Sequence, residues 1–251
     1  MTTVLRGALL SYKALFTWLN PLGYLSSRIV RPVGMAIAFI SLSSYYGAAI
    51  GRMLIGSSLL AGAGAVIYGM ALSVGNERSY GTLGTWLAAP QNKLAAACQR
   101  ALPHIADGVF GGLWTYLACG LLYGEMPLGV LPFTGLLTLA VLTTAGFGLA
   151  LSALALVVED LFIGPNAAEL VLMMLTGTLV PYDRLPGFLQ PVSDVLPLTH
   201  IMAAVTDRLA GSGWNTRQLL TEAAVGAGWF VVSSCFLFWT VKRASHRTEL
   251  A

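Results

Sequence analysis

Long runs without a charged residue, separated by short polar segments, make up most of the chain. These runs hold 20 residues before Arg52, 24 after it, 17 and 33 on either side of Glu125, and 19 after Glu222. A helix needs about 20 mostly apolar residues to cross a hydrocarbon layer about 30 Å thick. The pattern therefore predicts an all-α membrane protein with six transmembrane helices, at about 28–47, 53–75, 101–123, 130–157, 162–180 and 219–241.

Glu169 interrupts the fifth predicted span, 162–180. A carboxylate at the centre of a bilayer costs a few kcal/mol on insertion scales, so such a residue needs a reason to be there. Glu169 falls within two turns of the predicted start of the span. Two interpretations stay open: a carboxylate at the interface or between helices, and a group on a translocation path.

Composition and charge extend this interpretation. Hydrophobic residues make up 56% of the chain and charged residues 10%, whereas soluble domains contain about 25% charged residues. The net charge of +3 gives no reason to expect nucleic acid as a partner. Ten Lys and Arg residues fall on the predicted side of both termini and four on the other side. The positive-inside rule then predicts an inner or plasma membrane protein with both termini in the cytoplasm.

Residues 1–20 show apolar side chains at helical steps of three and four, beside basic and polar ones. This predicts an amphipathic helix lying in the membrane interface, ended by Asn20-Pro21, with residues 21–251 forming the six-helix domain. The apolar positions are Leu5, Leu9, Tyr12, Phe16 and Leu19.

The segment 77–90 joins the second and third predicted spans on the cytoplasmic side. Leu83, Trp86 and Leu87 have helical spacing, and Pro90 ends the segment. Because an apolar face on so short a helix needs a cover, we expect it to lie in a groove of a partner protein or on the membrane surface.

The segment 181–215 is the predicted external counterpart. Prolines recur through it and forbid one continuous helix, yet it stays rich in apolar residues. Irregular backbone at membrane depth has to be shielded by protein. We therefore predict short re-entrant helices here.

The residue types that could carry chemistry are scattered. The histidines, His104, His200 and His246, are far apart and predicted on different faces, and the three cysteines lack metal-site spacing, so no catalytic, cofactor or metal site is expected. The chain has no Gly-x-x-x-x-Gly-Lys-[Ser/Thr] loop for holding phosphates. Asp107 is predicted to pair with Arg100, seven residues before it.

In their order and spacing these segments resemble the integral membrane subunits of type-2 ABC exporters, over nearly the whole chain. That class shows a cytoplasmic Glu-Arg-x-x-Gly-Thr-Leu segment ending near a proline, matched here by Glu77, Arg78, Gly81, Thr82, Leu83 and Pro90. It also shows a Gly…Pro…Leu-Pro stretch and a Leu-Pro-Leu-Thr-His stretch, matched by Gly177, Pro181, Leu185, Pro186 and, in the segment 196–200, Pro197 and His200.

The resemblance implies a permease that pairs with a second, identical or related permease and binds two cytoplasmic ABC ATPase subunits, which hold ATP and Mg²⁺. The segment 77–90 would be the coupling helix, with ATPase contacts at Glu77, Arg78, Gly81, Thr82, Leu83, Trp86 and Leu87. Glu159 and Asp160 would form either a solvated turn or a second ATPase contact.

The leading hypothesis is a transport subunit without its own ATPase site. It would move an amphipathic or lipid-linked compound, such as a drug, antibiotic or glycolipid, outwards by alternating access. An ATPase-independent secondary transporter or channel, and a haem-export-like assembly factor, are the alternatives.

Overall fold

Four long apolar helices form the body of the protein in the computed structural model, which describes residues 21–47, 49–158 and 160–248. They are α4 (Ile50–Ser79), α6 (Lys93–Tyr123), α7 (Val130–Leu154) and α11 (Thr216–Thr248). Each is long and apolar enough to cross a membrane. The described residues form helices and connecting segments and contain no strand. The prediction of an all-helical membrane protein is confirmed, and four of the six predicted spans have their helix.

α4 lies at the centre of the bundle, in contact with α6, α7, α3 (Arg31–Tyr45) and α8 (Ile163–Leu175). In the most apolar window of α4, 83% of the residues are buried inside the protein, against 28% in α11. Gly62 and Gly108 allow the close approach of α4 and α6, because a Cβ on either would lie within 2.9 Å of the other's carbonyl oxygen. α4 is therefore the core helix, and α11 presents most of its surface outwards.

The other two predicted spans look different. Residues 21–45 form one helical stretch, made of α2 (Pro21–Leu25), the π-helix η1 (Ser26–Val30) and α3. The fifth predicted span is not one continuous helix over 162–180: α8 has 13 residues, which rise about 20 Å. The chain bends after Leu175, where Gly177 adopts a positive φ of 80°. The count of six crossings stays a prediction.

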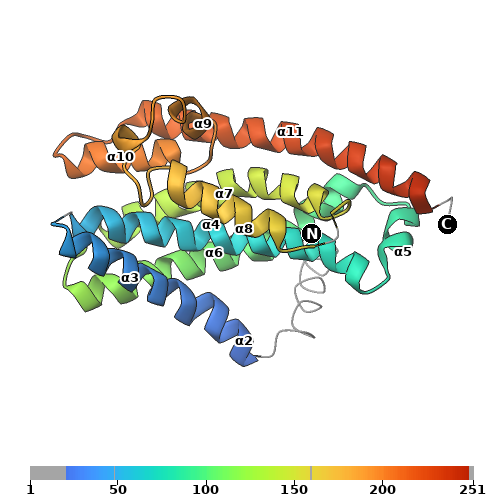
Figure 1. Ribbon diagram of the computed structural model, residues 1–251, viewed down its shortest axis with the longest axis horizontal. Coiled ribbons are helices and arrows are strands. Elements are labelled where there is room, and N and C mark those ends of the chain that lie inside the picture. The colour runs from blue at the N-terminus through green and yellow to red at the C-terminus, as the bar shows by residue number, and fades with distance from the viewer. Residues whose placement is uncertain (1–20, 48, 159, 249–251) are drawn as a thin grey trace.

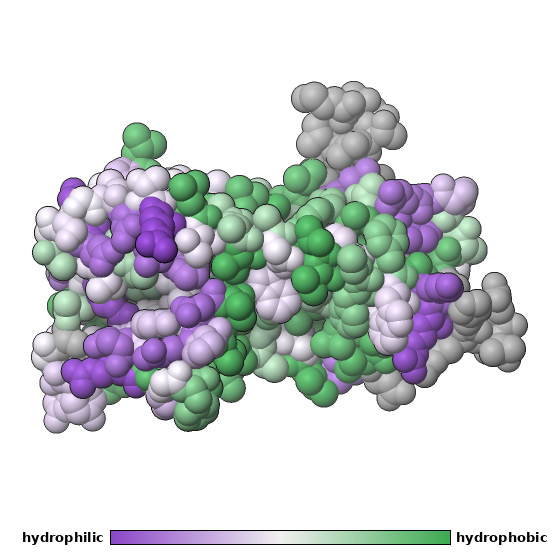
Figure 2. Space-filling model, turned by 90° about the horizontal axis from the view of Figure 1, so that it is seen from above, coloured by the Kyte–Doolittle hydropathy of each residue, from purple (hydrophilic) through white to green (hydrophobic). Residues whose placement is uncertain are grey.

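The two ends of the bundle carry different elements. Figure 1 shows α5 (Leu83–Ala88) at the end where α11 finishes, and α10 (Thr199–Leu209) at the opposite end together with α9 (Gln190–Asp194). The short 3-10 helix η2 (Tyr182–Arg184) belongs to the connection between α8 and α9. In Figure 2, apolar residues dominate the middle of the molecule and hydrophilic residues gather towards both ends. This is the distribution expected when the long axis of a bundle crosses a bilayer.

The predicted interfacial helix at 1–20 lies outside the described residues, and so does Glu159.

Candidate functional site

A Schellman turn connects α4 to α5. The N–H of Thr82 donates to the carbonyl of Glu77 at 2.8 Å, and that of Gly81 to the carbonyl of Arg78 at 3.0 Å. Gly81 has a φ of 71°, a left-handed conformation that favours glycine over any residue with a Cβ. The Glu-Arg-x-x-Gly-Thr sequence therefore encodes a sharp helix end.

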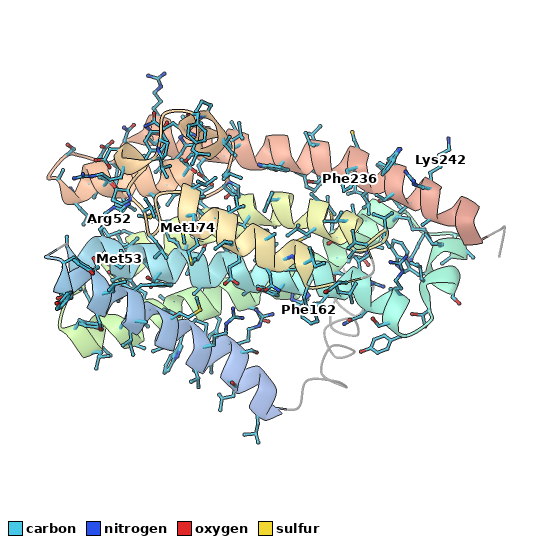
Figure 3. All side chains as sticks on the ribbon, viewed as in Figure 1. Arg52, Met53, Phe162, Met174, Phe236 and Lys242 are labelled. Carbon is cyan, nitrogen blue, oxygen red and sulfur yellow. The ribbon has the colours of Figure 1, made fainter. Side chains whose placement is uncertain are left out.

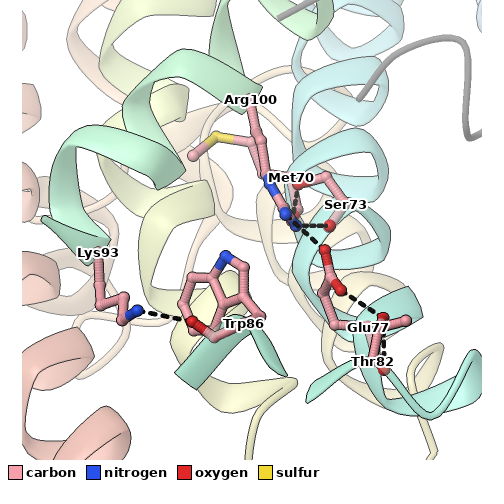
Figure 4. Close-up of polar contacts among 7 residues, drawn as sticks. All are labelled: Met70, Ser73, Glu77, Thr82, Trp86, Lys93 and Arg100. Atoms are coloured by element: carbon pink, nitrogen blue, oxygen red, sulfur yellow. Dashed lines mark hydrogen bonds and ion pairs between the residues drawn. The ribbon is translucent and has the colours of Figure 1, made fainter. Parts of the chain in front are cut away.

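Glu77 ties this turn to α6. Its Oε1 lies 2.5 Å from Nη2 of Arg100, and the hydroxyl of Thr82 donates to its Oε2 at 2.5 Å (Figure 4). Arg100 also donates to the carbonyl of Ser73 at 2.5 Å. The two charged side chains are only 19% and 14% exposed, so α4, the turn and α6 are held together by a shielded ion pair. Arg100 thus pairs with Glu77, and its predicted partner Asp107 lies 3.9 Å from Arg28 instead.

The apolar face of α5 packs on the protein itself. Trp86 is buried, and Leu83 and Leu87 lie half-buried against the core. Nζ of Lys93 donates to the carbonyl of Trp86 at 2.6 Å (Figure 4). It also donates at 2.7 Å to the carbonyl of Ala89, the residue that follows α5, so one carbonyl in the last turn and one just after it have a partner. Neither a partner groove nor the membrane surface is needed to cover this face. The sequence predicted the apolar stripe, and its cover is α11 and α4.

The exposed residues of the segment 77–90 are Ser79, Tyr80, Gly81, Thr82, Thr85, Ala88 and Pro90. These residues, and not Trp86, are accessible to another protein at this end of the bundle.

The connection between α7 and α8 lies beside the end of α4. Arg78 donates from Nη1 to the carbonyl of Val158 at 2.8 Å. Asp160 is exposed, and its Oδ1 accepts the N–H of Phe162 at 2.8 Å, one residue before α8. The structure therefore brings the end of α4 and Val158 together, although Arg78 and Val158 are 80 positions apart.

At the opposite end, residues 176–181 form a bend that lies against α4. Arg52, near the start of α4 (Figure 3), donates to the carbonyl of Gly177. Gly56 faces Thr178 so closely that a Cβ there would lie 2.3 Å from the Thr178 carbonyl oxygen. Thr176 donates to the carbonyl of Leu172 at 2.5 Å. The bend is therefore held by side-chain hydrogen bonds to backbone carbonyls and by the close packing of Gly56 against Thr178.

The remaining predicted external residues differ in exposure. Leu185 and Pro197 are buried, whereas Pro186 is exposed and Pro181 is intermediate. His200 is the second residue of α10. Its Nδ1 lies 2.9 Å from Oε1 of Gln218, and its Nε2 lies 3.0 Å from the carbonyl of Asp194. These contacts are those of a helix-terminal residue that connects α10 to its neighbours.

Glu222 is a site residue that the sequence analysis used only as a boundary. Its side chain is fully buried and accepts the N–H groups of Leu198 at 2.8 Å and His200 at 3.2 Å, and the hydroxyl of Thr143 at 2.9 Å. It thereby holds the start of α10 against α7 and α11. The sequence did contain a signal for this role, because an ionisable residue inside an apolar helix indicates a structural or functional site.

A cavity of about 370 Å³ lies between the 21–45 helical stretch, α4, α6 and α8. Four charged residues line it, in two ion pairs: Arg28 with Asp107 at 3.9 Å and Arg31 with Glu169 at 3.4 Å. Tyr68 of α4 donates to Oε2 of Glu169 at 2.9 Å. Glu169 is therefore an interhelical carboxylate that lines a cavity, and its role on a translocation path stays a prediction.

Comparison with known proteins finds the same family along most of the chain. A sequence model of the family described as "ABC-2 type transporter" matches residues 7–209. The chain is similar to the probable multidrug ABC transporter permease YbhR of Escherichia coli K12, with 27% identity over 143 residues, covering 51% of this chain and 35% of that protein. YbhR of Escherichia coli O157:H7 matches with the same values. The chain thus spans about a third of the length of these relatives. No solved structure matches it.

Proposed function

The chain belongs to the ABC-2 type transporter family, and from this membership we propose that it is the permease subunit of an ATP-driven exporter. Two permease subunits, identical or related, would pair in the inner or plasma membrane and bind two cytoplasmic ATPases that hold ATP and Mg²⁺. Each subunit would cross the membrane six times with both termini in the cytoplasm. The compound moved outwards by alternating access would be amphipathic or lipid-linked.

The observation that carries this proposal is the way α5 is tied to two long helices. The bond of Thr82 to Glu77 connects the start of α5 to α4, the bonds of Lys93 connect α5 to α6, and the Glu77–Arg100 ion pair joins α4 to α6. A force applied to α5 would therefore move the ends of two core helices together, because no flexible linker lies between them. Arg78 extends the connection to the segment before α8.

The exposed residues Tyr80, Thr82 and Thr85 are the ones that an ATPase would contact. Leu83, Trp86 and Leu87 would act from inside, by passing the displacement to the bundle.

Replacing Thr85 with arginine is expected to abolish co-purification of the ATPase encoded beside this chain. A new charge without a partner in a protein interface costs enough to weaken binding by about tenfold or more. Thr216→Arg, an exposed threonine at the start of α11, is the matched control and should leave the complex intact. Equal recovery of the ATPase with both variants would contradict the proposal.

Breaking the Glu77–Arg100 pair is expected to separate ATP hydrolysis from transport. With Arg100→Gln the ATPase should still bind, while ATP-driven movement of a fluorescent amphiphile into inside-out vesicles falls by about tenfold, because α4 loses its ion pair to α6 and a displacement of α5 no longer moves both helices together. The exposed pair Asp183–Arg184, 3.8 Å apart, supplies the control Arg184→Gln. Transport that follows a proton gradient and needs no ATPase would favour the secondary-transporter alternative, for which the charged cavity is the supporting feature.

A further inference from the structure

Arg28 and Arg31 place two guanidinium groups on one wall of the cavity between the 21–45 stretch, α4, α6 and α8. They are three residues apart along the 21–45 stretch, and both line the cavity. Arg28 belongs to the π-helix η1, and π-helical turns occur frequently at functional sites. The two positive charges are therefore presented together.

Both guanidinium groups are loosely paired. The distances of 3.9 Å from Arg28 to Asp107 and 3.4 Å from Arg31 to Glu169 exceed the roughly 2.7–2.9 Å of a strong charge-assisted hydrogen bond. Arg31 is 52% exposed, whereas Glu169 is 19% exposed and also accepts the Tyr68 hydroxyl. The accessible charge at this end of the cavity is thus positive.

Besides the four charged residues, the wall carries the polar side chains of Ser27, Ser57, Tyr68, His104 and Asn166, and the rest of it is apolar. Met35 and Phe39 follow Arg31 along α3 and face Leu60 and Ala61 of α4 across the cavity. Phe39 lies eight residues beyond Arg31, about 12 Å along the helix. The cavity therefore has a cationic end and an apolar end, arranged along the bundle axis.

We propose that this cavity binds an amphiphile with an apolar chain and an anionic headgroup, a phosphate or carboxylate. The headgroup contacts Arg28 and Arg31, and the chain lies between α3 and α4. The proposal rests on the proposed function, since it names the substrate class of that permease. The headgroup would then lie nearer the end of the bundle that carries α5 and the chain would point towards the opposite end, which is the orientation of a lipid in the cytoplasmic leaflet (Figure 1).

Binding to the full-length chain in nanodiscs of neutral phosphatidylcholine tests this assignment. The probes are dodecyl phosphate, dodecyltrimethylammonium and inorganic phosphate, followed by microscale thermophoresis. Dodecyl phosphate is expected to bind saturably and at least about tenfold more tightly than the other two, because only it satisfies both ends of the cavity. Comparable binding of the trimethylammonium compound or of inorganic phosphate would overturn the proposal.

Two substitutions predict changes of opposite sign. Arg31→Gln is expected to weaken dodecyl phosphate binding by about tenfold, while Arg31→Lys keeps most of it. Glu169→Gln removes the competing carboxylate and is expected to tighten binding several-fold. Arg184→Gln, at an arginine that is 79% exposed in the connection between α8 and α9, is the control and should change nothing. An equal response of Arg31→Gln and Arg184→Gln, or weaker binding with Glu169→Gln, would overturn the site.

Adding phosphatidylglycerol to the nanodiscs distinguishes the source of the ligand. Competition by this lipid would support the site and identify a bilayer phospholipid as an occupant, and binding without competition would support an exported amphiphile. No ATPase takes part in these measurements. A chain that binds dodecyl phosphate but recruits no ATPase would therefore keep the site and lose the proposed function.

Discussion

Replacing Glu222 with alanine is expected to destabilise the protein by about 3–5 kcal/mol, since a buried donor left without an acceptor costs about 1–3 kcal/mol. Three donors lose their acceptor at once: the N–H groups of Leu198 and His200 and the hydroxyl of Thr143. The two backbone groups belong to the start of α10, where the first N–H groups have no partner within the helix. Leu198 also has a φ of 80°, a conformation that costs energy for a residue with a side chain and persists only when its surroundings hold it.

Unfolding of the purified protein in detergent micelles, followed by circular dichroism against temperature, measures this effect. Glu222→Gln keeps one acceptor oxygen and should fall between the alanine variant and the unmodified protein. Asp183→Ala removes a carboxylate that is 78% exposed and is expected to change stability by less than about 0.5 kcal/mol. If Glu222→Ala and Asp183→Ala unfold at the same temperature, Glu222 does not hold α10 in place.

Hydropathy was sufficient to predict the long helices from the sequence, because the thickness of the bilayer sets a minimum length that any spanning helix must meet. The predicted spans 53–75, 101–123, 130–157 and 219–241 fall on α4, α6, α7 and α11. The helices extend beyond several of these limits. Glu77 marks the end of the apolar run after Arg52, yet α4 continues to Ser79, because the charge of Glu77 is paired inside the protein.

Contacts between distant segments were the part that the sequence could not supply. The stripe of Leu83, Trp86 and Leu87 predicted an amphipathic helix, but nothing in its spacing identifies α11 as its cover. A hydropathy window over 162–180 averages across Gly177, whose positive φ marks the bend after the end of α8.

The cavity also could not be predicted from the sequence. Its charged residues come from three separate helices, and Arg28 and Asp107 are 79 positions apart, so no local motif connects them. The resemblance to a family located the segment 77–90 and assigned it a role, while the Schellman turn gives the physical reason for its Gly-Thr.

Replacing Gly56 with alanine is expected to cost about 3 kcal/mol or more, at the upper end of the range for overpacked cores. The new Cβ would lie 2.3 Å from the carbonyl oxygen of Thr178. The obstacle is backbone, so no rotation of a side chain relieves the clash. The bend at 176–181 would have to move, and it is held by Arg52 through Gly177 and by Thr176 through Leu172.

Gly34→Ala is the matched control, because a Cβ at Gly34 meets nothing within 4 Å. Alanine there should be neutral or slightly stabilising, since glycine inside a helix costs up to about 1 kcal/mol. Thermal unfolding of the two variants measures the difference. A Gly56→Ala protein as stable as Gly34→Ala would mean that the bend does not lie against α4.

Gly56→Ala also tests whether the two ends of the bundle have different roles in the complex. Gly56 lies at the end opposite α5, so Gly56→Ala should leave recruitment of the ATPase unchanged while ATP-driven transport is lost. Arg100→Gln is expected to impair transport from the α5 end, also with the ATPase still bound. If both variants block transport while Thr85→Arg alone releases the ATPase, then binding of the ATPase depends on the surface of α5. Movement of the bundle then depends on contacts at both of its ends. Loss of the ATPase with Gly56→Ala would contradict this division.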